Sequence, residues 1–221
     1  MFITKDEWLT EVLGKDVYNV TAIDGYFTAA TYVDSLYCVR TNSTPQANWA
    51  INRGFNLICS EITFQGRVYF TNYDFSIPNV QEYLNEDLSF LAQNCFTTDR
   101  FHRDPILTYK QAEKVKIEWL KNACSGKRGD RLIIATIENK PVGFLIVIEK
   151  DDSVIIDLVG VSEEARGKKV GTSLIRWVMI NYPGHIIQAG TQIDNLGGIK
   201  LYEKFGINEI VGFNYILHYH T

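Results

Sequence analysis

The sequence contains few cysteines, and their positions argue against two kinds of scaffold. The four cysteines in 221 residues share no short spacing that would bring metal ligands together. They are also too few for a domain that is built on disulfides. We therefore expect no metal site and reduced structural thiols at Cys38, Cys59, Cys95 and Cys124.

The chain also lacks an excess of basic residues and a long apolar run. Its formal net charge of −4 argues against a protein that coats nucleic acid, which usually carries a basic stripe. No segment is long and apolar enough to span a bilayer, and the opening residues MFITKDEWLT carry charge from Lys5 onward. We expect a cytoplasmic protein without nucleic-acid or membrane partners, whose phosphate-bearing ligands are small molecules.

The first third of the chain is typical of a small α/β unit. The expected elements are a helix capped by Thr4 and stopped by Gly14, strands over 16–21, 27–33 and 35–39, a helix from Thr44 to about Arg53, and a strand over 55–64. Aromatic and polar residues alternate irregularly over 67–80, which indicates a connecting segment. We place the domain boundary there, with a small N-terminal α/β domain and connector over 1–80 and a second domain over 81–221.

The second domain is predicted to follow the order helix, helix, strand, strand, strand, helix, strand, helix, strand. Thr108 and Gln111 form a capping-box signature at the start of the second helix. The other expected elements are a helix over 86–96, strands over 131–137, 142–148 and 153–161, a helix from Gly171 to before Pro183, a strand over 185–191, a helix over 196–205 and a strand over 207–217.

A basic, glycine-bearing turn links the strand over 153–161 to the next helix. The segment 162–169 carries one arginine, one glycine and two lysines before apolar residues resume. The first N–H groups of a helix have no intrahelical partner and carry the positive end of the helix dipole. The turn is therefore predicted to bind a phosphate group, such as the pyrophosphate of a cofactor.

This element order and the RGKKVG turn resemble the GCN5-related N-acetyltransferase (GNAT) superfamily over residues 85–218. The family's turn reads Gln or Arg, two residues, Gly, one residue, Gly or Ala; Arg166 and Gly171 match, whereas Lys169 stands at the first glycine. The resemblance implies an α/β (α+β) fold with a central mixed, splayed sheet and a coenzyme A co-substrate. Its implied cofactor-binding residues are Val161, Arg166, Gly167, Lys168, Lys169, Val170, Gly171 and Thr172.

The stretch from Asn195 to Ile207 resembles the last helix of the same superfamily. By that match, Tyr202 protonates the departing coenzyme A thiolate and Asn195 holds the pantetheine arm. A phenol with a reference pKa near ~10 is protonated at neutral pH and is a suitable acid for a thiolate. Tyr202 also belongs to an apolar helical stripe, so a purely structural role is the alternative.

Several shorter motifs resemble the dTDP-fucosamine acetyltransferase family. They are the small N-terminal unit, CFTTDRF at 95–101, WLKNA at 119–123 and TQIDN at 191–195. Members acylate the amino group of a nucleotide-linked 6-deoxy sugar, and their N-terminal unit resembles a truncated GNAT fold. A neighbouring group transfers 3-hydroxybutyryl to a 3-amino-3,6-dideoxyhexose. The resemblance therefore implies acetyl-CoA or 3-hydroxybutyryl-CoA as donor and a dTDP-linked amino-dideoxy sugar as acceptor, for surface polysaccharide biosynthesis.

The implied reaction is direct attack of the sugar amine on the thioester. Its oxyanion needs a backbone N–H donor, which we expect at Val159 or Val161, with simple strand burial as the alternative. Candidate bases for the amine are His102, Asp104 and Asp99, and a water relay is the alternative. Acyl length would depend on a tunnel lined by Leu158, Val159, Gln192 and Leu201.

The candidate sugar-nucleotide residues lie in two loops and one turn. Arg100 and Arg103 suit a diphosphate, although a solvated charged loop is the alternative. The other candidates are Phe101, Gln192 and the aromatic residues Tyr69, Phe70, Tyr73 and Phe75. Two other functions stay open: transfer to another amine or a protein N-terminus, and a non-catalytic acyl-CoA-binding module. The sequence allows a homodimer but does not determine the oligomeric state.

Overall fold

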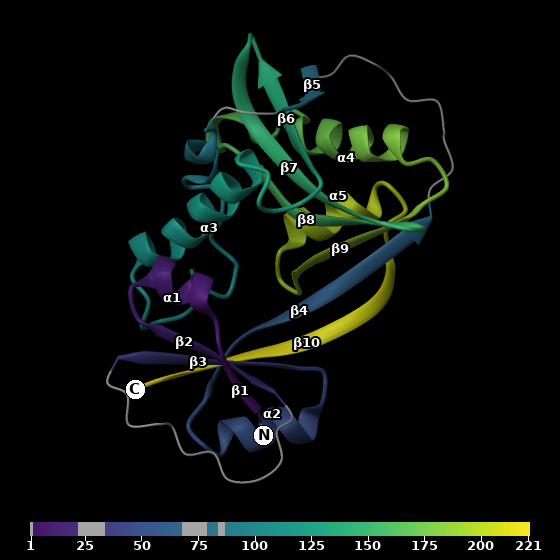
Figure 1. Cartoon of the computed structure of the whole chain (residues 1–221). Helices are drawn as coiled ribbons and strands as arrows, with labels where there is room; N and C mark the ends of the chain where they lie inside the picture. The colour runs from purple at the N-terminus through teal and green to yellow at the C-terminus, as the bar shows by residue number, and fades with distance from the viewer. Residues whose placement is uncertain (1, 22–33, 68–78, 84–86) are drawn as a thin grey trace.

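The computed structural model describes residues 2–21, 34–67, 79–83 and 87–221. Within this part of the chain, ten strands form one mixed sheet in the order β1-β2-β3-β10-β4-β9-β8-β7-β6-β5 (Figure 1). The strands are β1 (Phe2–Lys5), β2 (Asp16–Thr21), β3 (Ser35–Thr41), β4 (Asn56–Arg67), β5 (Asn79–Glu82), β6 (Arg131–Ile137), β7 (Lys140–Lys150), β8 (Ser153–Val161), β9 (Ile186–Gln192) and β10 (Glu209–His220). The helices are α1 (Glu7–Leu13), α2 (Thr44–Ile51), α3 (Tyr109–Cys124), α4 (Val170–Asn181) and α5 (Leu196–Glu203), with 3₁₀ turns η1 (Ser89–Ala92) and η2 (Glu163–Ala165).

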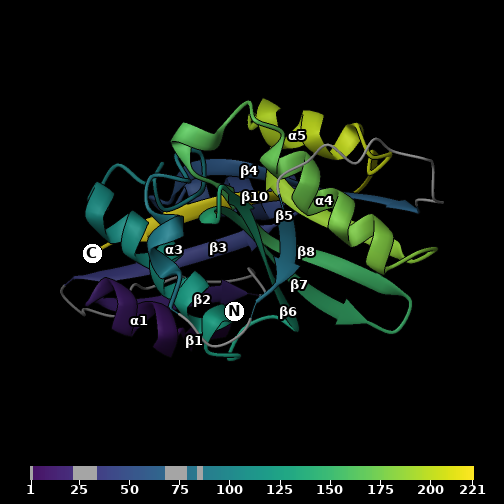
Figure 2. The same ribbon diagram turned by 90° about the horizontal axis from the view of Figure 1, so that it is seen from above.

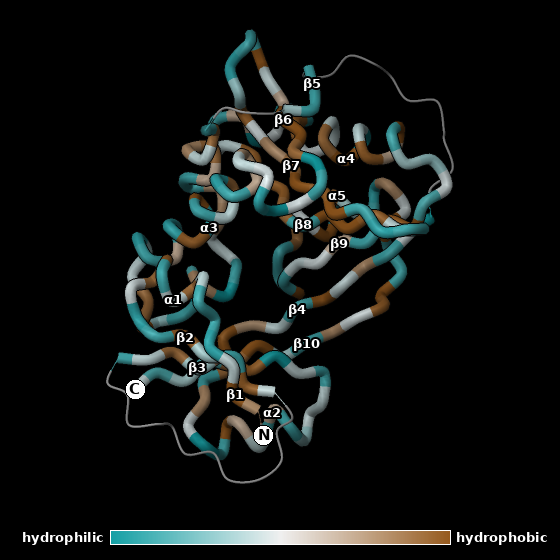
Figure 3. Tube along the Cα trace, viewed as in Figure 1, coloured by the Kyte–Doolittle hydropathy of each residue, from teal (hydrophilic) through white to brown (hydrophobic). Residues whose placement is uncertain are grey.

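Helices cover both faces of the central strands, so these strands bury both of their faces. On β6, Ile133 packs into the cluster that contains α4 and α5, whereas its neighbour Ile134 packs toward α3 and η1. Leu145 and Ile146 on β7 divide in the same way. Figure 2 shows α3 and α4 on opposite sides of these strands, and Figure 3 shows hydrophobic residues gathered along β7 and β8. In the described residues, no helix is long and apolar enough to cross a membrane.

The sheet runs without interruption across the expected domain boundary. The strand β4, from the first third of the chain, pairs with β9 on one side and with the C-terminal strand β10 on the other. The far end of β10 pairs with β3, so the two halves share a long strand (Figure 1). The division near residue 80 remains a prediction, and strands from both sides of it form one sheet.

The sheet opens between β8 and β9. These two strands pair in parallel only over Ser153–Ile156 and Ile186–Ala189, while both continue for several more residues. The register between β7 and β8 also shifts, which makes Asp157 the extra residue of a β-bulge. The bulge reverses the alternation of side chains, because Ile156 packs toward α4 and Leu158 packs toward α3. The predicted splayed sheet is therefore present, with its opening after Ile156.

One expected helix is wrong in the part that the structure describes. A helix was expected over 86–96, but residues 87–96 contain only the 3₁₀ turn η1. The Asp87 carboxylate accepts the Ser89 N–H at 2.9 Å, and this local hydrogen bond competes with helical pairing. Asn94 has a φ of 56°, which ends any helical path.

Other expectations were correct in type and differ at their ends. The first helix is capped by Asp6 rather than Thr4, because Thr4 belongs to β1 and the Asp6 side chain accepts the Leu9 N–H. Ser43, rather than Thr44, is the N-cap of α2. The capping box at Thr108 and Gln111 is present at the start of α3. The expected strand over 27–33 lies outside the described residues.

Candidate active site

Two cavities meet where β8 and β9 diverge. One, the turn cavity, has a volume of about 610 Å³ and extends from the RGKKVG turn to α5. The other, the strand cavity, has a volume of about 410 Å³ and lies between β4, β8, β9 and α3. Both are lined by Phe96, Thr98, Val159, Asn195 and Tyr202. A ligand in one cavity can therefore contact a ligand in the other at these five residues.

The turn cavity collects most of the residues that the sequence assigns to coenzyme A. Its wall includes Val159, Val161, Arg166, Gly167, Lys169, Val170, Gly171, Thr172, Asn195, Leu201 and Tyr202. Lys168 belongs to the same turn but is not part of this wall. The N-terminus of the twelve-residue helix α4 lies at this cavity, so its free N–H groups are available to an anionic ligand.

Two residues of the RGKKVG turn have positive φ values, and one of them is the lysine that stands at the family's first glycine. Gly167 and Lys169 both adopt left-handed backbone conformations, with φ values of 79° and 63°. Glycine adopts this region readily, whereas an L-residue there costs roughly 1–2 kcal/mol. Lys169 therefore occupies a position that favours glycine and retains the left-handed conformation.

The Arg166 side chain supports the turn from outside. Its guanidinium donates to the carbonyl oxygens of Asn94 and Cys95 at 3.0 and 3.3 Å, which ties the turn to the segment that follows η1. Burial raises the pKa of the Cys95 thiol to about 11, and this thiol donates to the Leu91 carbonyl. Arg166 thus holds two walls of the turn cavity together.

Asn195 and Tyr202 bring α5 to the junction of the cavities. The Asn195 side chain caps α5 by accepting the Gly198 N–H at 3.2 Å, and its amide donates to Thr191 Oγ1 at 2.9 Å. Tyr202 is buried, and this burial raises the pKa of its phenol to about 12. The phenol is therefore protonated at neutral pH and available as a hydrogen-bond donor.

Backbone N–H groups of β8 also point into the opening. Ser162 N–H donates to Val142 O on β7 at 2.9 Å. Because successive strand residues direct their N–H groups to opposite edges, Gly160 faces β7 like Ser162, and Val159 and Val161 face away from it. The edge they face is the one that β9 leaves unpaired after Ile156.

The strand cavity is lined by three acid–base pairs whose formal charges cancel. Arg40 pairs with Glu61, Arg128 pairs with Asp157, and Lys116 pairs with Asp99. The neutral polar residues of the wall are Thr63, Thr98, Gln188, Thr191, Gln192 and Asn195. The cavity therefore offers many hydrogen-bonding groups and little net charge.

The bulge residue Asp157 is tightly held. Arg128 binds it through two hydrogen bonds, Nε to Oδ2 at 2.7 Å and a terminal nitrogen to Oδ1 at 2.8 Å. Trp119 Nε1 donates to the same carboxylate at 3.0 Å, and the Arg128 guanidinium lies 3.9 Å from the Trp119 ring centroid. These contacts fix the bulge and occupy the Asp157 carboxylate, which makes it a poor base.

Asp99 and His102 lie together, but only Asp99 lines a cavity. His102 Nδ1 is 2.6 Å from Asp99 Oδ2, and the Phe101 N–H donates to the other oxygen at 3.0 Å. Burial opposes ionisation of Asp99, yet the charge of Lys116 and these hydrogen bonds hold its pKa below the usual range. Within the described residues, neither cavity wall includes His102.

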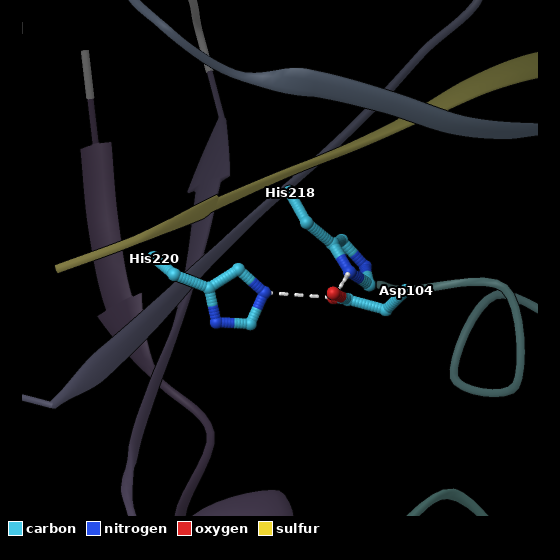
Figure 4. A group of neighbouring side chains, drawn as sticks. All are labelled: Asp104, His218 and His220. Atoms are coloured by element: carbon cyan, nitrogen blue, oxygen red, sulfur yellow. Dashed lines mark hydrogen bonds and ion pairs between the residues drawn. The ribbon is translucent and has the colours of Figure 1, made fainter. Parts of the chain in front are cut away.

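Asp104 forms a separate buried cluster. His218 Nδ1 and His220 Nε2 lie 2.6 and 2.8 Å from its Oδ2 atom (Figure 4). The three ligand atoms lie within 4.8 Å of one another, and their types suit a metal ion. Both short distances nevertheless describe hydrogen bonds to one oxygen. The cluster joins the loop before α3 to the end of β10 and is not part of either cavity wall.

The remaining predicted sugar-site residues are divided. Gln192 lines the strand cavity and donates to Glu61 at 3.4 Å. Phe101 is 1% exposed and packs in the core beneath α1, with Arg100 stacked on its ring. Arg103 forms an ion pair with Asp194. These last three residues are absent from both cavity walls, and Phe70, Tyr69, Tyr73 and Phe75 lie outside the described residues.

Sequence reasoning missed Lys116, Arg128 and Asp157. Lys116 occupies a position in the apolar stripe of α3, between Val115 and Trp119, and Asp157 interrupts an apolar strand. A charge at a buried position of a periodic pattern was the available signal. Arg128 lies in a loop and gave no such signal.

The fold and cavities agree with the comparisons to known proteins. The family model described as "Acetyltransferase (GNAT) family" matches residues 89–207, and the chain belongs to this family. It is thus an acyltransferase-family protein, and members of this family use acyl-CoA as co-substrate.

Similar proteins include one curated relative and several solved structures. The spore coat polysaccharide biosynthesis protein SpsD of Bacillus subtilis (strain 168) is 30% identical over 134 residues, which cover 59% of this chain and 46% of that protein. The match thus spans about half of the relative's length. A functionally unknown conserved protein from Staphylococcus epidermidis ATCC 12228 superposes with a TM-score of 0.60 at 14% identity, over 83% of this chain and 71% of its own. A GCN5-related N-acetyltransferase from Sphaerobacter thermophilus gives 0.56 at 13% identity, over 87% and 62%.

Proposed function

We propose that the protein transfers an acetyl or 3-hydroxybutyryl group from acyl-CoA to the amino group of a dTDP-linked amino-dideoxy sugar. The product would serve surface polysaccharide biosynthesis, and the similarity to a protein named for spore coat polysaccharide biosynthesis supports this setting. The N-terminal part, up to residue 80, would form the smaller domain that borders the acceptor.

The meeting of two chemically different cavities at Val159, Asn195 and Tyr202 carries this proposal. The turn cavity suits the phosphates and pantetheine of coenzyme A, because it begins at a helix N-terminus and a basic turn. The strand cavity then receives the acceptor. An acyl group at the junction lies between the two, as direct transfer requires.

The charge balance of the strand cavity favours a hydroxyl-rich sugar with a single amine over a polycationic acceptor. A site that binds a polyamine or a basic peptide would carry carboxylates in excess of basic groups. Here Glu61, Asp99 and Asp157 each have a basic partner. The amide and hydroxyl groups of the same wall suit sugar hydroxyls. We place the sugar ring in the strand cavity and propose Arg100 and Arg103, which lie outside both cavity walls, as partners of the diphosphate.

The mechanism follows from groups at the junction. The sugar amine attacks the thioester carbonyl, and the N–H of Val159, with Val161 as the neighbouring donor, stabilises the oxyanion. When the carbon–sulfur bond breaks, Tyr202 donates its proton to the thiolate. The raised pKa of the phenol keeps this proton in place at neutral pH.

A thiol-release panel tests the proposal. Acetyl-CoA and 3-hydroxybutyryl-CoA are each combined with 3-amino and 4-amino dTDP sugars, a polyamine and a peptide with a free N-terminus. We expect release with an amino sugar only, and a loss of about 10²- to 10⁴-fold in kcat for Tyr202→Phe. Thiol release with the peptide or polyamine alone would show that the acceptor is another amine and not an amino sugar. No release with any acceptor, together with tight acyl-CoA binding, would indicate a binding module.

A further inference from the structure

A buried lysine in the wall of the strand cavity has no role in the chemistry described so far. Lys116 projects from α3, and its side chain is 7% exposed. It lines the strand cavity together with Leu158 and Val159, which adjoin the junction with the turn cavity. Lysine is rarely buried without a partner, because an ammonium group loses much hydration in the interior.

The surroundings of Lys116 hold its amine without saturating it. Nζ lies 3.9 Å from Asp99 Oδ1, which is too long for a hydrogen bond, and no other hydrogen bond of Nζ is found among the described residues. Three aromatic rings surround it, with centroids 4.7 to 5.8 Å away: Trp119, Phe96 and Phe101. The amine can therefore form hydrogen bonds with a ligand in the cavity.

We propose that Lys116, in its neutral form, is the base that takes a proton from the ammonium group of the bound acceptor. This inference rests on the proposed function and names a catalytic residue that no sequence motif indicates. The acceptor amine enters as R–NH₃⁺, and one N–H bond breaks as a new N–H bond forms on Nζ. The free electron pair on the acceptor nitrogen then attacks the thioester carbon.

The proton count of the whole reaction closes with this base. Lys116 leaves the first step as an ammonium group and returns its proton to solvent through the cavity. The attacking nitrogen loses a second proton as the amide forms, and this proton restores Tyr202 through solvent after the phenol has protonated the thiolate. One proton is released for each acyl group transferred.

The same surroundings serve both protonation states of Lys116. Burial lowers the pKa of the amine, although the carboxylate of Asp99 acts in the opposite direction. The groups that face it from other elements are Asp99 and Arg100 in the loop before α3, Arg128 in the loop after α3, and Asp157 on β8. Once the proton arrives, Asp99 and the three ring faces stabilise the ammonium group. The lowered pKa gives this amine a larger neutral fraction than an ordinary lysine has, as a base requires.

Asp99 and His102, two of the predicted base candidates, have a positioning role in this proposal. His102 Nδ1 lies 2.6 Å from Asp99 Oδ2, whereas Lys116 Nζ faces the other carboxylate oxygen, Asp99 Oδ1. Asp99 and His102 are therefore positioning residues, because they fix the carboxylate that faces the amine.

The test compares Lys116→Met, Lys116→Arg and the exposed neighbour Lys114→Met over a range of pH. Arginine retains the positive charge but cannot act as a base, whereas methionine retains the volume and packs among the rings. We expect both Lys116 variants to lower kcat/KM for the acceptor by about 10²- to 10⁴-fold near neutral pH, with an unchanged KM for acyl-CoA. The deficit should shrink at alkaline pH, where the acceptor amine arrives already deprotonated. Lys114→Met should behave as the wild type does.

Two results would overturn the proposal. One is a wild-type pH profile in Lys116→Arg. The other is a deficit in both variants that is equal at every pH, which is the signature of a packing or binding role. A second readout needs no acceptor: the Nζ signal of Lys116 is titrated by NMR in isotopically labelled protein and assigned with Lys116→Arg. We expect a pKa below that of ordinary lysine, and an ordinary value would contradict the base assignment. If the wild type releases no thiol with any amino sugar while this pKa is lowered, the proposed acceptor is wrong and the base is retested with the acceptor that the panel identifies.

Discussion

Two buried aspartates, five residues apart in the same loop, are the centres of clusters with opposite relations to the cavities. Asp99 lines the strand cavity and lies 3.9 Å from the Lys116 amine, which has no hydrogen-bond partner among the described residues. Asp104 lies away from both cavity walls and accepts two hydrogen bonds, from His218 and His220. The Asp99 cluster faces a cavity that a ligand can enter, whereas the Asp104 cluster is closed off and keeps His218 Nε2 and His220 Nδ1 buried without a hydrogen-bond partner.

The difference shows that burial of titratable groups does not by itself identify a site. A buried polar group without a hydrogen-bond partner costs free energy, so folded proteins usually supply a partner from within unless a ligand supplies it. In the Asp104 cluster, one carboxylate oxygen is bound by both histidines, which suits a structural link between the loop and β10, although His218 Nε2 and His220 Nδ1 are buried without a hydrogen-bond partner. The Asp99 cluster gains such a partner only when the cavity is filled. We therefore expect Asp104 to determine stability and Asp99 to determine turnover.

The largest expected effect is that of Asp104→Asn on stability. The change replaces the charged acceptor shared by the two histidines with a neutral amide, whose oxygen accepts more weakly and whose NH₂ group cannot accept, which costs about 3 to 5 kcal/mol of unfolding free energy. Urea denaturation measures this loss. The fraction that remains folded should keep the wild-type kcat, because Asp104 is outside both cavity walls. A stable variant with lost activity would reverse the comparison.

The matched change, Asp99→Asn, should have the opposite profile. We expect a 10- to 100-fold loss in kcat/KM for the acceptor, equivalent to about 1.4 to 2.7 kcal/mol, because the ammonium form of Lys116 loses its carboxylate. The loss of unfolding free energy should be smaller than for Asp104→Asn, since water in the cavity can hydrate the exposed groups. Equal destabilisation by the two variants would show that both clusters are structural.

The contrast between the clusters also explains what the sequence could predict. Periodicity located β6 and β8 to the residue and α3 with its capping box, because these patterns are local. The contact between Asp104 and His218 spans 114 residues, and the insertion of β4 between β9 and β10 is equally remote in sequence. No local rule includes such pairings, so the sequence favoured His102 among the three base candidates of the loop over 99–104 and could not show that Asp99 is the one that lines a cavity.

The grouping of the residues proposed to bind coenzyme A was more predictable than that of the residues proposed to bind the acceptor, for a physical reason. A phosphate site at a helix N-terminus needs only a turn and a helix, which are adjacent in sequence, and Arg166, Gly167 and Lys169 line one cavity. The acceptor side combines β4, α3, β8 and β9, which are far apart in the chain. Its charged pairs become visible only when the sheet is assembled.

The pH dependence of stability separates the two clusters further. Burial lowers the pKa of His218, but Cys38 and Asp104 raise it, and the net direction is upward. A group with a raised folded pKa contributes stability that is complete below its unfolded pKa, about 6.5, and is lost as pH rises through the folded pKa. We therefore expect the wild type to lose more unfolding free energy than Asp104→Asn as pH rises from below about 6.5 through the raised pKa of His218. Asp99→Asn should follow the wild type over this range, and parallel curves for wild type and Asp104→Asn would contradict the assignment.

The smallest expected effect extends the comparison from the carboxylates to the lysines. Lys169, unlike Lys116, is exposed, and its backbone has a φ of 63° at the N-cap of α4. Lys169→Gly removes the left-handed strain of roughly 1–2 kcal/mol but adds freedom to the unfolded chain worth roughly 0.4–1 kcal/mol, so we expect a net gain between about 0 and about 1.6 kcal/mol.

Lys169→Ala is the matched control, because alanine keeps the left-handed strain and loses only the charged side chain. Its stability should equal that of the wild type, while both variants should raise the KM for acyl-CoA to a similar, salt-dependent extent if the ammonium group faces the pyrophosphate. A raised KM in Lys169→Gly alone would assign the effect to the backbone of the turn. An unchanged KM in both would show that the helix N-terminus binds the phosphates without this lysine, and the glycine of the family's turn would then serve conformation alone.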